Sequence, residues 1–290
     1  MTPTVHIVVG PTAVGKTKYA IELAQKLQTE IISADARQCY QELNIGVARP
    51  SNEELAQVKH HFIASHSIQH TVNAGVFEQY ALEKATELLA KFGSAVMVGG
   101  TGLYIKAFVE GMDQIPAIDP ALRNRIQQDV STKGIEWLQD QVQKLDPDYW
   151  AIADQGEKQN TQRLSRALEV ITGTGQSILR FQNHTKKARP FNIKKIGLEI
   201  PMEQLYERIN QRVHQMFEMG LEEEVKALRP QFHLNALQTV GYQEWLPYLE
   251  DNQSKEAVLQ AIQQNTRHYA KRQMTWFKKD PEINWIQASM

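Results

Sequence analysis

The chain has 290 residues, of which 42% are hydrophobic and 22% charged, so it has the composition of a globular protein and is neither disordered nor collagen-like. Its 32 basic and 33 acidic side chains give a net charge of -1, so the overall charge of the protein does not by itself indicate a polyanionic partner. A single cysteine, Cys39, excludes a disulfide framework, and without a leader or an apolar run of roughly 18 residues we expect a cytoplasmic protein with no membrane partner.

Apolar segments alternate with helical segments from the start of the chain. The run TVHIVVG precedes a helix predicted for residues 16–27, and the run EIISAD precedes a helix predicted for residues 74–92. Asn73 is the expected N-cap of that second helix, Gly93 is its expected stop, and the strand SAVMVGG comes next. Strands separated by amphipathic helices predict an α/β fold, with a parallel sheet flanked by helices on both faces.

The pattern changes near Gly111. Helix starts at Asp119-Pro120 and stops at Gly134 and Asp146-Pro147 follow without a convincing strand, which indicates a helical insertion. The strand IKKIGLEI then resumes the α/β pattern, and the helices MEQLYERINQRVHQMFEMG and KEAVLQAIQQNTRHYAKRQMTWFKK come after it. We therefore expect a discontinuous core domain formed by residues 1–112 and 190–290, with an all-helical insertion domain over residues 113–189.

The segment GPTAVGKT has the Gly-x4-Gly-Lys-Thr spacing of a phosphate-binding loop, the P-loop. Its glycines let backbone N–H groups point inward, and the following helix adds the positive end of its dipole. Lys16 can reach phosphate oxygens, and the Thr17 hydroxyl can bind Mg²⁺. A chance match is the alternative, but the motif has the strand before it and the helix after it that it requires. The expected phosphate-binding residues are Gly10, Pro11, Thr12, Ala13, Val14, Gly15, Lys16 and Thr17, with Thr17 also the metal ligand.

Asp35 follows the second predicted strand, at the sheet edge where ligands bind. A carboxylate near bound phosphates is electrostatically costly, so we interpret it as a group for proton transfer or acceptor binding. The alternative is a helix N-cap, and one aspartate can fill both roles. The strand AVMVGGTG has no acid at its end. An NTP-hydrolysing enzyme usually carries one there, whereas a small-molecule kinase stays compatible with the loop and Asp35.

Long motifs follow one another along nearly the whole chain: GPTAVGKT, SADARQCY, IGVARPS, HHFI, VGGTGLYIKAF, NTQRLSRALEV, YERINQRVHQMFEMGLEEEV, VGYQEW and TRHYAKRQMTWFKK. Their order resembles that of bacterial-type tRNA dimethylallyltransferases, also called tRNA isopentenyltransferases. The resemblance implies transfer of a dimethylallyl group from dimethylallyl diphosphate to the exocyclic N6 amine of the adenosine 3′-adjacent to the anticodon. The P-loop would then hold the leaving diphosphate. The chain departs from the family at Ala36, where serine is common, and at Cys39, where an aliphatic residue is usual.

The resemblance also assigns catalytic residues: Asp35, Thr101 and Arg212. The adenine amine is a poor nucleophile, so Asp35 is the candidate general base. Negative charge grows on the diphosphate as the C–O bond breaks, and Lys16, Mg²⁺ and Arg212 can stabilise it. Arg208 lies four residues before Arg212 on the same helical face, although a solvated arginine pair is the alternative. The glycines before Thr101 let an acceptor approach, or simply permit tight packing.

Basic and aromatic residues alternate in the last predicted helix, where TRHYAKRQMTWFKK contains no acid. Such a surface suits RNA phosphates and bases, although a solvated helix face with its aromatic residues in the core is the alternative. The residues expected to bind tRNA, through its anticodon stem-loop, are Asp35, Ala36, Arg37, Gln38, Thr101, Arg123, Gln159, Asn160, Thr161, Gln162, Arg163, Lys271 and Arg272. The insertion domain is expected to contact the anticodon arm, no obligate protein partner is implied, and packing or substrate-channel roles are favoured over zinc for His60, His61 and His66.

Three interpretations remain open on the residues alone. A tRNA prenyltransferase uses all the features above. A P-loop kinase of a small hydroxyl substrate leaves the basic helix and the insertion unexplained. A non-catalytic, nucleotide-gated RNA-binding protein leaves Asp35 and Arg212 unexplained.

Overall fold

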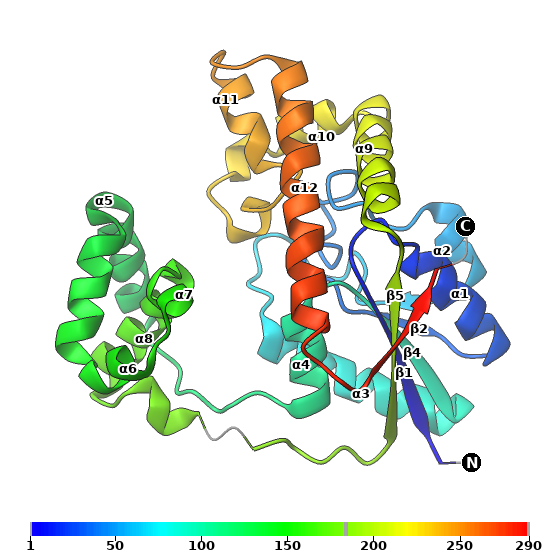
Figure 1. Ribbon diagram of the computed structural model, residues 1–290, viewed down its shortest axis with the longest axis horizontal. Helices are drawn as coiled ribbons and strands as arrows, with labels where there is room; N and C mark the ends of the chain where they lie inside the picture. The colour runs from blue at the N-terminus through cyan, green and yellow to red at the C-terminus, as the bar shows by residue number, and fades with distance from the viewer. Residues whose placement is uncertain (1, 183–184, 289–290) are drawn as a thin grey trace. The chain divides into compact units, whose positions relative to one another are not determined.

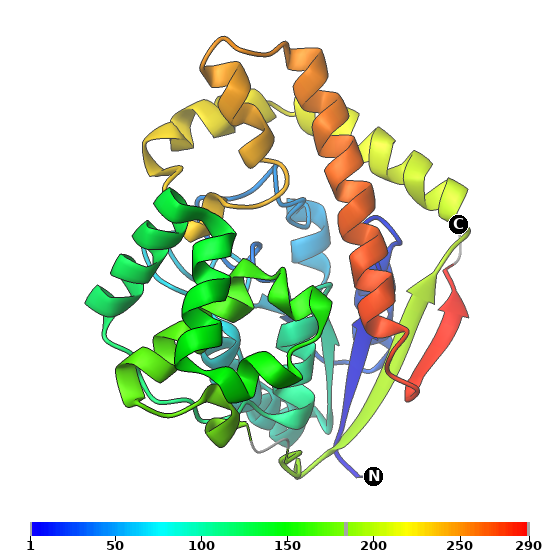
Figure 2. The same cartoon turned by 60° about the vertical axis from the view of Figure 1, so that its left-hand side comes forward.

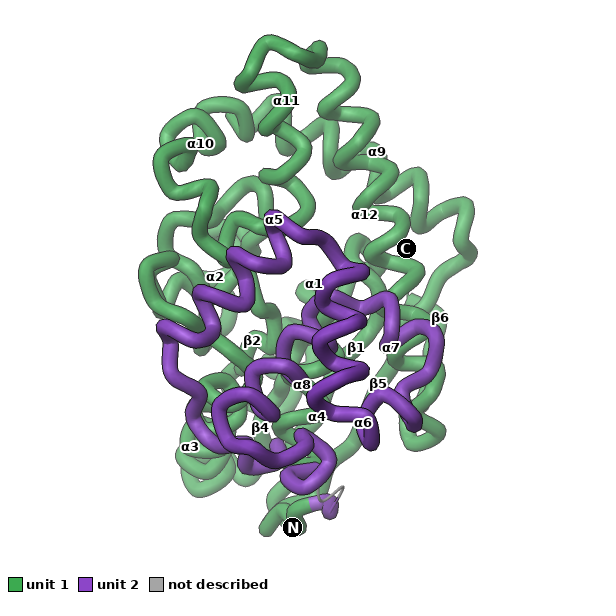
Figure 3. The backbone as a smooth tube through the Cα atoms, turned by 90° about the vertical axis from the view of Figure 1, so that its left-hand side faces the viewer, with its two compact units in different colours: residues 1–111, 187–290 green, residues 112–186 purple. Residues whose placement is uncertain are grey.

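The structure is a computed structural model that describes residues 2–182 and 185–288. The chain divides into two compact units, the first formed by Met1–Gly111 with Lys187–Met290 and the second by Met112–Lys186 (Figure 3). The boundaries expected from the sequence lay at 112/113 and 189/190. The backbone N–H of Lys187 donates to the carbonyl of Glu110 at 2.8 Å, so the chain leaves the first unit and returns to it at one point.

A parallel sheet forms the centre of the first unit. In the described part of the chain it has six strands in the order β3-β2-β4-β1-β5-β6, and every pairing is parallel, which confirms the predicted fold class. Val8 of β1 lies opposite Val98 of β4 and Ile196 of β5. The strands are β1 Thr4–Val9, β2 Ile31–Ser33, β3 His60–His61, β4 Ser94–Val98, β5 Asn192–Glu199 and β6 Ile283–Gln287.

Helices flank the sheet (Figure 1), and successive side chains of a strand point to opposite faces of it. Val8, Val96 and Val98 belong to one buried cluster with Ala20 and Ile21 of helix α1, Lys16–Lys26. Helix α3 packs against strands β1, β2 and β4, and α4 packs against α3. The other helices of this unit are α2 Asn52–Gln57, α3 Ala74–Phe92, α4 Gly102–Glu110, α9 Met202–Glu218, α10 Leu221–Leu228, α11 Leu246–Leu249 and α12 Lys255–Phe277.

The helix ends follow from capping residues. The Asn73 side chain accepts hydrogen bonds from the N–H groups of Gly75 and Val76, and Gly93 closes α3 in the left-handed conformation with a φ of 71°. Both ends of α3 lie where the sequence predicted them. The long helix α12 starts at Ser254, whose hydroxyl accepts from the N–H of Ala257, and it lies beside α9 in the two views (Figures 1 and 2).

The sequence analysis missed two edge strands. Strand β3 has only two residues, and β6 follows the last helix in a segment without an alternating apolar pattern. Strand β6 pairs with β5, and Lys195 Nζ of β5 reaches Asp280 Oδ2 and Glu282 Oε2 before β6, each at 2.7 Å. Tertiary pairing, not local propensity, therefore defines these strands.

The second unit is helical over its described residues, 112–182 and 185–186. Its elements are α5 Pro120–Leu145, α6 Pro147–Ile152, α7 Gln155–Lys158, α8 Thr161–Thr174 and a 3-10 turn over Ile178–Phe181. Asp119 caps α5 as predicted, through a hydrogen bond from the N–H of Ala121. The predicted stop at Gly134 is confirmed, since its backbone is not helical (φ 77° and ψ -176°) and a second helical segment of α5 follows this kink. The core contains Leu138, Val142, Leu164 and Leu168.

No helix that the structure describes combines the length and the apolar character needed to cross a membrane.

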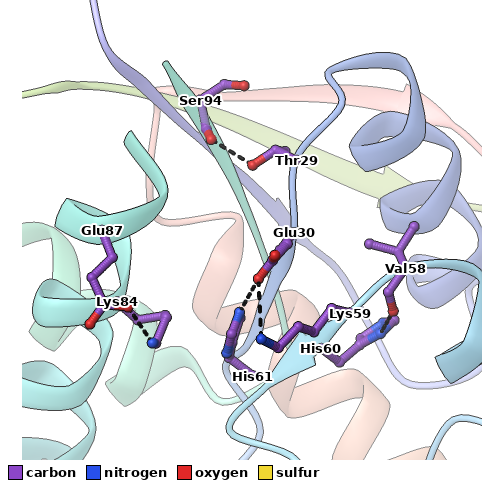
Figure 4. A network of polar contacts seen from close by, with 9 residues as sticks. All are labelled: Thr29, Glu30, Val58, Lys59, His60, His61, Lys84, Glu87 and Ser94. Atoms are coloured by element: carbon purple, nitrogen blue, oxygen red, sulfur yellow. Dashed lines mark hydrogen bonds and ion pairs between the residues drawn. The ribbon is translucent and has the colours of Figure 1, made fainter. Parts of the chain in front are cut away.

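A network of polar contacts lies at the edge of the sheet, beside β2 and β3 (Figure 4). The buried imidazole of His61 donates through Nε2 to Glu30 Oε2 at 2.6 Å, and Lys59 Nζ lies 4.0 Å from the same oxygen. Thr29 Oγ1 donates to the carbonyl of Ser94 at 2.6 Å. Burial lowers the pKa of His61 and outweighs the opposing effect of Glu30. The neutral ring is thus the form that the fold favours.

We predict that His61→Gln flattens part of the acid dependence of stability. The pKa of His61 is lowered from 6.5, so the stability that depends on its neutral ring is present above that value and is lost as the pH falls below it. In the variant, the free energy of unfolding should change less between about pH 6.5 and about pH 5. Urea unfolding across this range measures the slope, with His233→Gln at an exposed position as the control. Equal slopes in wild type and His61→Gln would contradict the assignment.

Candidate active site

The P-loop joins β1 to α1. Gly15 precedes the helix with a φ of 101°, a left-handed conformation that glycine adopts without strain. The Lys16 ammonium donates to the carbonyl of Pro11 at 2.7 Å and so lies folded over the loop. The loop therefore has the strand, turn and helix that a phosphate-binding loop requires.

Two cations face the same cavity from different elements. Lys16 comes from the start of α1, and Arg212 comes from α9, where its Nη1 donates to the Thr12 hydroxyl at 3.4 Å. Burial, and to a smaller extent Arg212, lower the pKa of Lys16 to about 7 against the opposing effect of Asp35. Burial also lowers the pKa of Arg212. Among the described residues, no carboxylate forms an ion pair with either side chain. Glu54, which also lines the cavity, opposes the fall in the pKa of Arg212, so nearby acids balance the positive charge of the pair only in part and leave it able to attract an anion.

Asp35 and Thr101 lie at the ends of neighbouring strands β2 and β4. Asp35 Oδ1 accepts hydrogen bonds from the N–H groups of Arg37 and Gln38, at 2.9 and 3.1 Å. No helix directly follows Asp35, so the helix N-cap considered from the sequence is wrong; the carboxylate instead caps a turn over residues 36–39, and these hydrogen bonds fix its orientation. Thr101 Oγ1 accepts from the N–H of Ala36 at 3.0 Å, which ties the two strand ends together.

One cavity of about 630 Å³ in the first unit contains all four of these side chains. Thr12, Ala13, Gly15 and Thr17 of the P-loop also line it, as do residues 36–38. Gly10, Pro11 and Val14 do not line it and are buried beneath the loop. Arg208, the second arginine of the predicted pair, is not among the lining residues either. An apolar part of the wall consists of Ile209, Val213, Met216 and Ile262.

Helix α12 contributes side chains to this cavity that sequence reasoning did not place there. Gln273 and Tyr269 point into it, four residues apart on one face of the helix. Burial raises the pKa of the Tyr269 phenol and Asp35 adds to the rise, while Arg37, Arg272 and a hydrogen bond with Thr101 oppose it. The signal available in the sequence was this spacing, which puts both residues on one face of the helix.

Comparison with known proteins identifies the family. Residues 38–280 match the family model described as IPP transferase. A tRNA dimethylallyltransferase of Christiangramia forsetii is 46% identical over 280 residues, which cover 97% of this chain and 92% of that protein. The chain belongs to the tRNA dimethylallyltransferase family.

Solved structures of this family have the same fold. A tRNA isopentenylpyrophosphate transferase from Bacillus halodurans is 34% identical, with a TM-score of 0.71 over 99% of this chain and 90% of that one. The corresponding enzyme from Staphylococcus epidermidis is 30% identical, with a TM-score of 0.69 over 99% and 93% of the two chains. A eukaryotic dimethylallyltransferase shown acting on tRNA shares the fold, with a TM-score of 0.79, 23% identity and coverage of 99% and 74%.

The basic residues of α12 divide into two groups. Arg267 Nη1 donates to Asn210 Oδ1 at 2.7 Å, and Lys278 pairs with Glu199, so these two cations are engaged within the protein. Contacts within the protein therefore account for these two cations. The other group forms a hollow of about 410 Å³ on the helix, lined by His268, Lys271, Arg272, Thr275, Trp276 and Lys279.

In the second unit, several residues that the family resemblance assigns to tRNA also have local contacts. Arg123 Nε lies 3.2 Å from Glu169 Oε2, and Arg163 pairs with Glu157. Asn160 caps α8 by accepting from the N–H of Arg163 at 3.1 Å. Residues 159–163 are nevertheless exposed, so their outer surface is open to a partner.

The lowered pKa of Lys16 predicts that anion binding takes up a proton. In the free site its pKa is about 7, so the ammonium loses its charge as the pH rises above this value, and a bound diphosphate restores it. The affinity for inorganic diphosphate should therefore fall roughly tenfold between about pH 7 and about pH 8.5. Calorimetry in buffers of different ionisation enthalpy measures the uptake of about one proton.

Lys16→Arg is the matched control, because a guanidinium stays charged over this range. The affinity for diphosphate should depend less on pH in this variant. The dependence that remains comes from the titration of diphosphate itself. If wild type and Lys16→Arg have the same slope, Lys16 is not the group that titrates.

Proposed function

We propose that this protein transfers the dimethylallyl group of dimethylallyl diphosphate to the exocyclic N6 amine of the adenosine 3′-adjacent to the anticodon in tRNA. The observation that carries the proposal is the arrangement of one cavity, in which Asp35 and Thr101 accompany Lys16 and Arg212, two cations that form no ion pair with a carboxylate in the described part of the chain. Membership of the tRNA dimethylallyltransferase family supports it.

The cationic part of the cavity suits a departing diphosphate. When the allylic C–O bond breaks, its electron pair stays on the diphosphate and positive charge develops on the allylic carbon. Lys16, the inward N–H groups of the P-loop and Arg212 stabilise the leaving group more strongly as its charge grows. The apolar wall of Ile209, Val213 and Met216 offers a surface for the five-carbon chain.

Mg²⁺ is the proposed metal, with the Thr17 hydroxyl as its protein ligand. Thr17 lines the cavity beside Lys16. A single protein oxygen is sufficient, because Mg²⁺ keeps several waters and takes further oxygens from substrate phosphates. When bound, the ion would supply further positive charge at the diphosphate oxygens.

Asp35 is the proposed general base. As the new C–N bond forms, the amine nitrogen becomes positively charged and one of its protons passes to the carboxylate of Asp35. The hydrogen bonds from Arg37 and Gln38 to Oδ1 hold this carboxylate in one orientation. Thr101, tied to the N–H of Ala36, lies at the adjacent strand end, where it can contact the acceptor nucleotide.

The RNA must present an extruded adenosine, because a stacked base cannot reach the cavity. We assign the hollow on α12 to the tRNA, with Lys271 and Arg272 contacting phosphates and Trp276, which is 41% exposed, available to stack on a base. The second unit is proposed to contact the anticodon arm through Arg123 and residues 159–163.

Asp35→Asn should lower the rate of prenyl transfer by about a hundredfold or more, because it removes the base and nearly preserves the shape. Dissociation constants for dimethylallyl diphosphate and tRNA should stay within a few fold. Single-turnover transfer with saturating unmodified tRNA measures the rate. Near-normal transfer would exclude Asp35 as the base.

The kinase interpretation is tested on the wild-type protein. If it phosphorylates a small hydroxyl compound with ATP and transfers no prenyl group to tRNA, the kinase interpretation is favoured.

Replacing Lys271 and Arg272 together by Ala should weaken tRNA binding and flatten its dependence on salt, with a slope lower by about 2. Binding of dimethylallyl diphosphate should barely change. Filter binding of a stem-loop across a salt series measures both effects. The matched control replaces two exposed lysines on other helices, Lys26 on α1 and Lys91 on α3, by Ala. A full salt slope in the Lys271/Arg272 variant would place the RNA elsewhere.

A further inference from the structure

Gln273 bridges two segments that are distant in the sequence. This residue of α12 is only 5% exposed, and both ends of its amide are engaged. Its Oε1 accepts a hydrogen bond from the backbone N–H of Thr12 at 2.8 Å, and its Nε2 donates to the backbone carbonyl of Gly100 at 2.9 Å. One side chain therefore joins the P-loop to the end of β4.

The surroundings of this amide are shaped to fit it. A Cβ atom at position 100 would lie 2.1 Å from Gln273 Nε2, so the glycine leaves the space that the amide occupies. The bridge needs an acceptor on one branch and a donor on the other. An ionised glutamate has no donor, and methionine and leucine have neither group.

Each end of the bridge is adjacent to one half of the reaction site. Thr12 receives the hydrogen bond from Arg212, beside the carbonyl of Pro11 that binds Lys16. Gly100 precedes Thr101, whose hydroxyl holds the turn that follows Asp35. The Gln273 amide thus connects the cations of the cavity to the general base and the acceptor-side threonine.

We infer that Gln273 is a positioning residue, which fixes the separation between the diphosphate-holding loop and the acceptor-holding strand end. The inference rests on the proposed function, since it concerns the same transfer reaction. The allylic carbon and the N6 amine must meet at a distance set by these two segments, and small misplacements of reacting atoms cost large factors in rate. Gln273 touches neither reacting atom and acts through the backbone groups of Thr12 and Gly100.

The test compares Gln273→Met with Gln264→Met. Methionine has nearly the length of glutamine but forms neither hydrogen bond, and Gln264 is an exposed glutamine of the same helix. With both substrates saturating, Gln273→Met should lower the single-turnover rate roughly thirtyfold, the loss expected for two hydrogen bonds. Dissociation constants for dimethylallyl diphosphate and tRNA should change by less than about threefold. Gln264→Met should behave as wild type.

Gln273→Glu adds a readout that a merely structural residue would not give. Its ionised form still accepts from the N–H of Thr12 but cannot donate to Gly100, whereas the protonated form can do both. The rate of this variant, divided by the wild-type rate at each pH, should therefore recover as the pH falls. A flat ratio, or a Gln273→Met rate within about threefold of wild type, would overturn the inference. If wild type itself transfers no prenyl group to tRNA, the proposed function fails, and the inference fails with it.

Discussion

The constraint on which the site depends is the placement of two like charges in one cavity, where no carboxylate of the described residues forms an ion pair with either of them. Burial lowers the pKa of both side chains, and Arg212 lowers that of Lys16 as well, so keeping the two groups charged costs the folded protein free energy in the absence of a ligand. A bound polyanion removes that cost. The P-loop and α9 bring the two cations to one cavity. The parallel sheet makes this possible because its strand ends meet at one edge.

Local signals in the sequence were sufficient for most of the fold. Helix ends depend on contacts within a few residues, so short stretches of sequence are enough to predict them. Examples are the caps Asn73 and Gly93 and the start of α5 after Asp119. Strands β3 and β6 were not predicted, because the first has two residues and the second exists through pairing with β5. The stop predicted at Gly134 is likewise local, and the helical conformation is interrupted there before a second helical segment of α5 begins.

The site was predictable to a similar extent. Motifs at strand ends indicated Lys16, Asp35 and Thr101, because spacing in the chain fixes which edge of a parallel sheet they reach. Which face of α12 meets the cavity was not readable, since Gln273 has partners 261 and 173 residues away. The basic residues of that helix looked equivalent in the sequence. In the structure, Glu199 and Asn210 engage Lys278 and Arg267, and only part of the group stays open on the helix surface.

The hydrogen bond between Lys187 and Glu110 has a consequence for how this architecture can vary. The chain leaves the sheet-containing unit and rejoins it at two residues that share a backbone hydrogen bond. The helical unit is therefore an insertion between two adjacent positions of the first unit. Its length and helix number can change, or a tight turn can replace it, without altering the register of any strand. The helical unit can therefore diverge among relatives while the cavity at the sheet edge keeps its geometry.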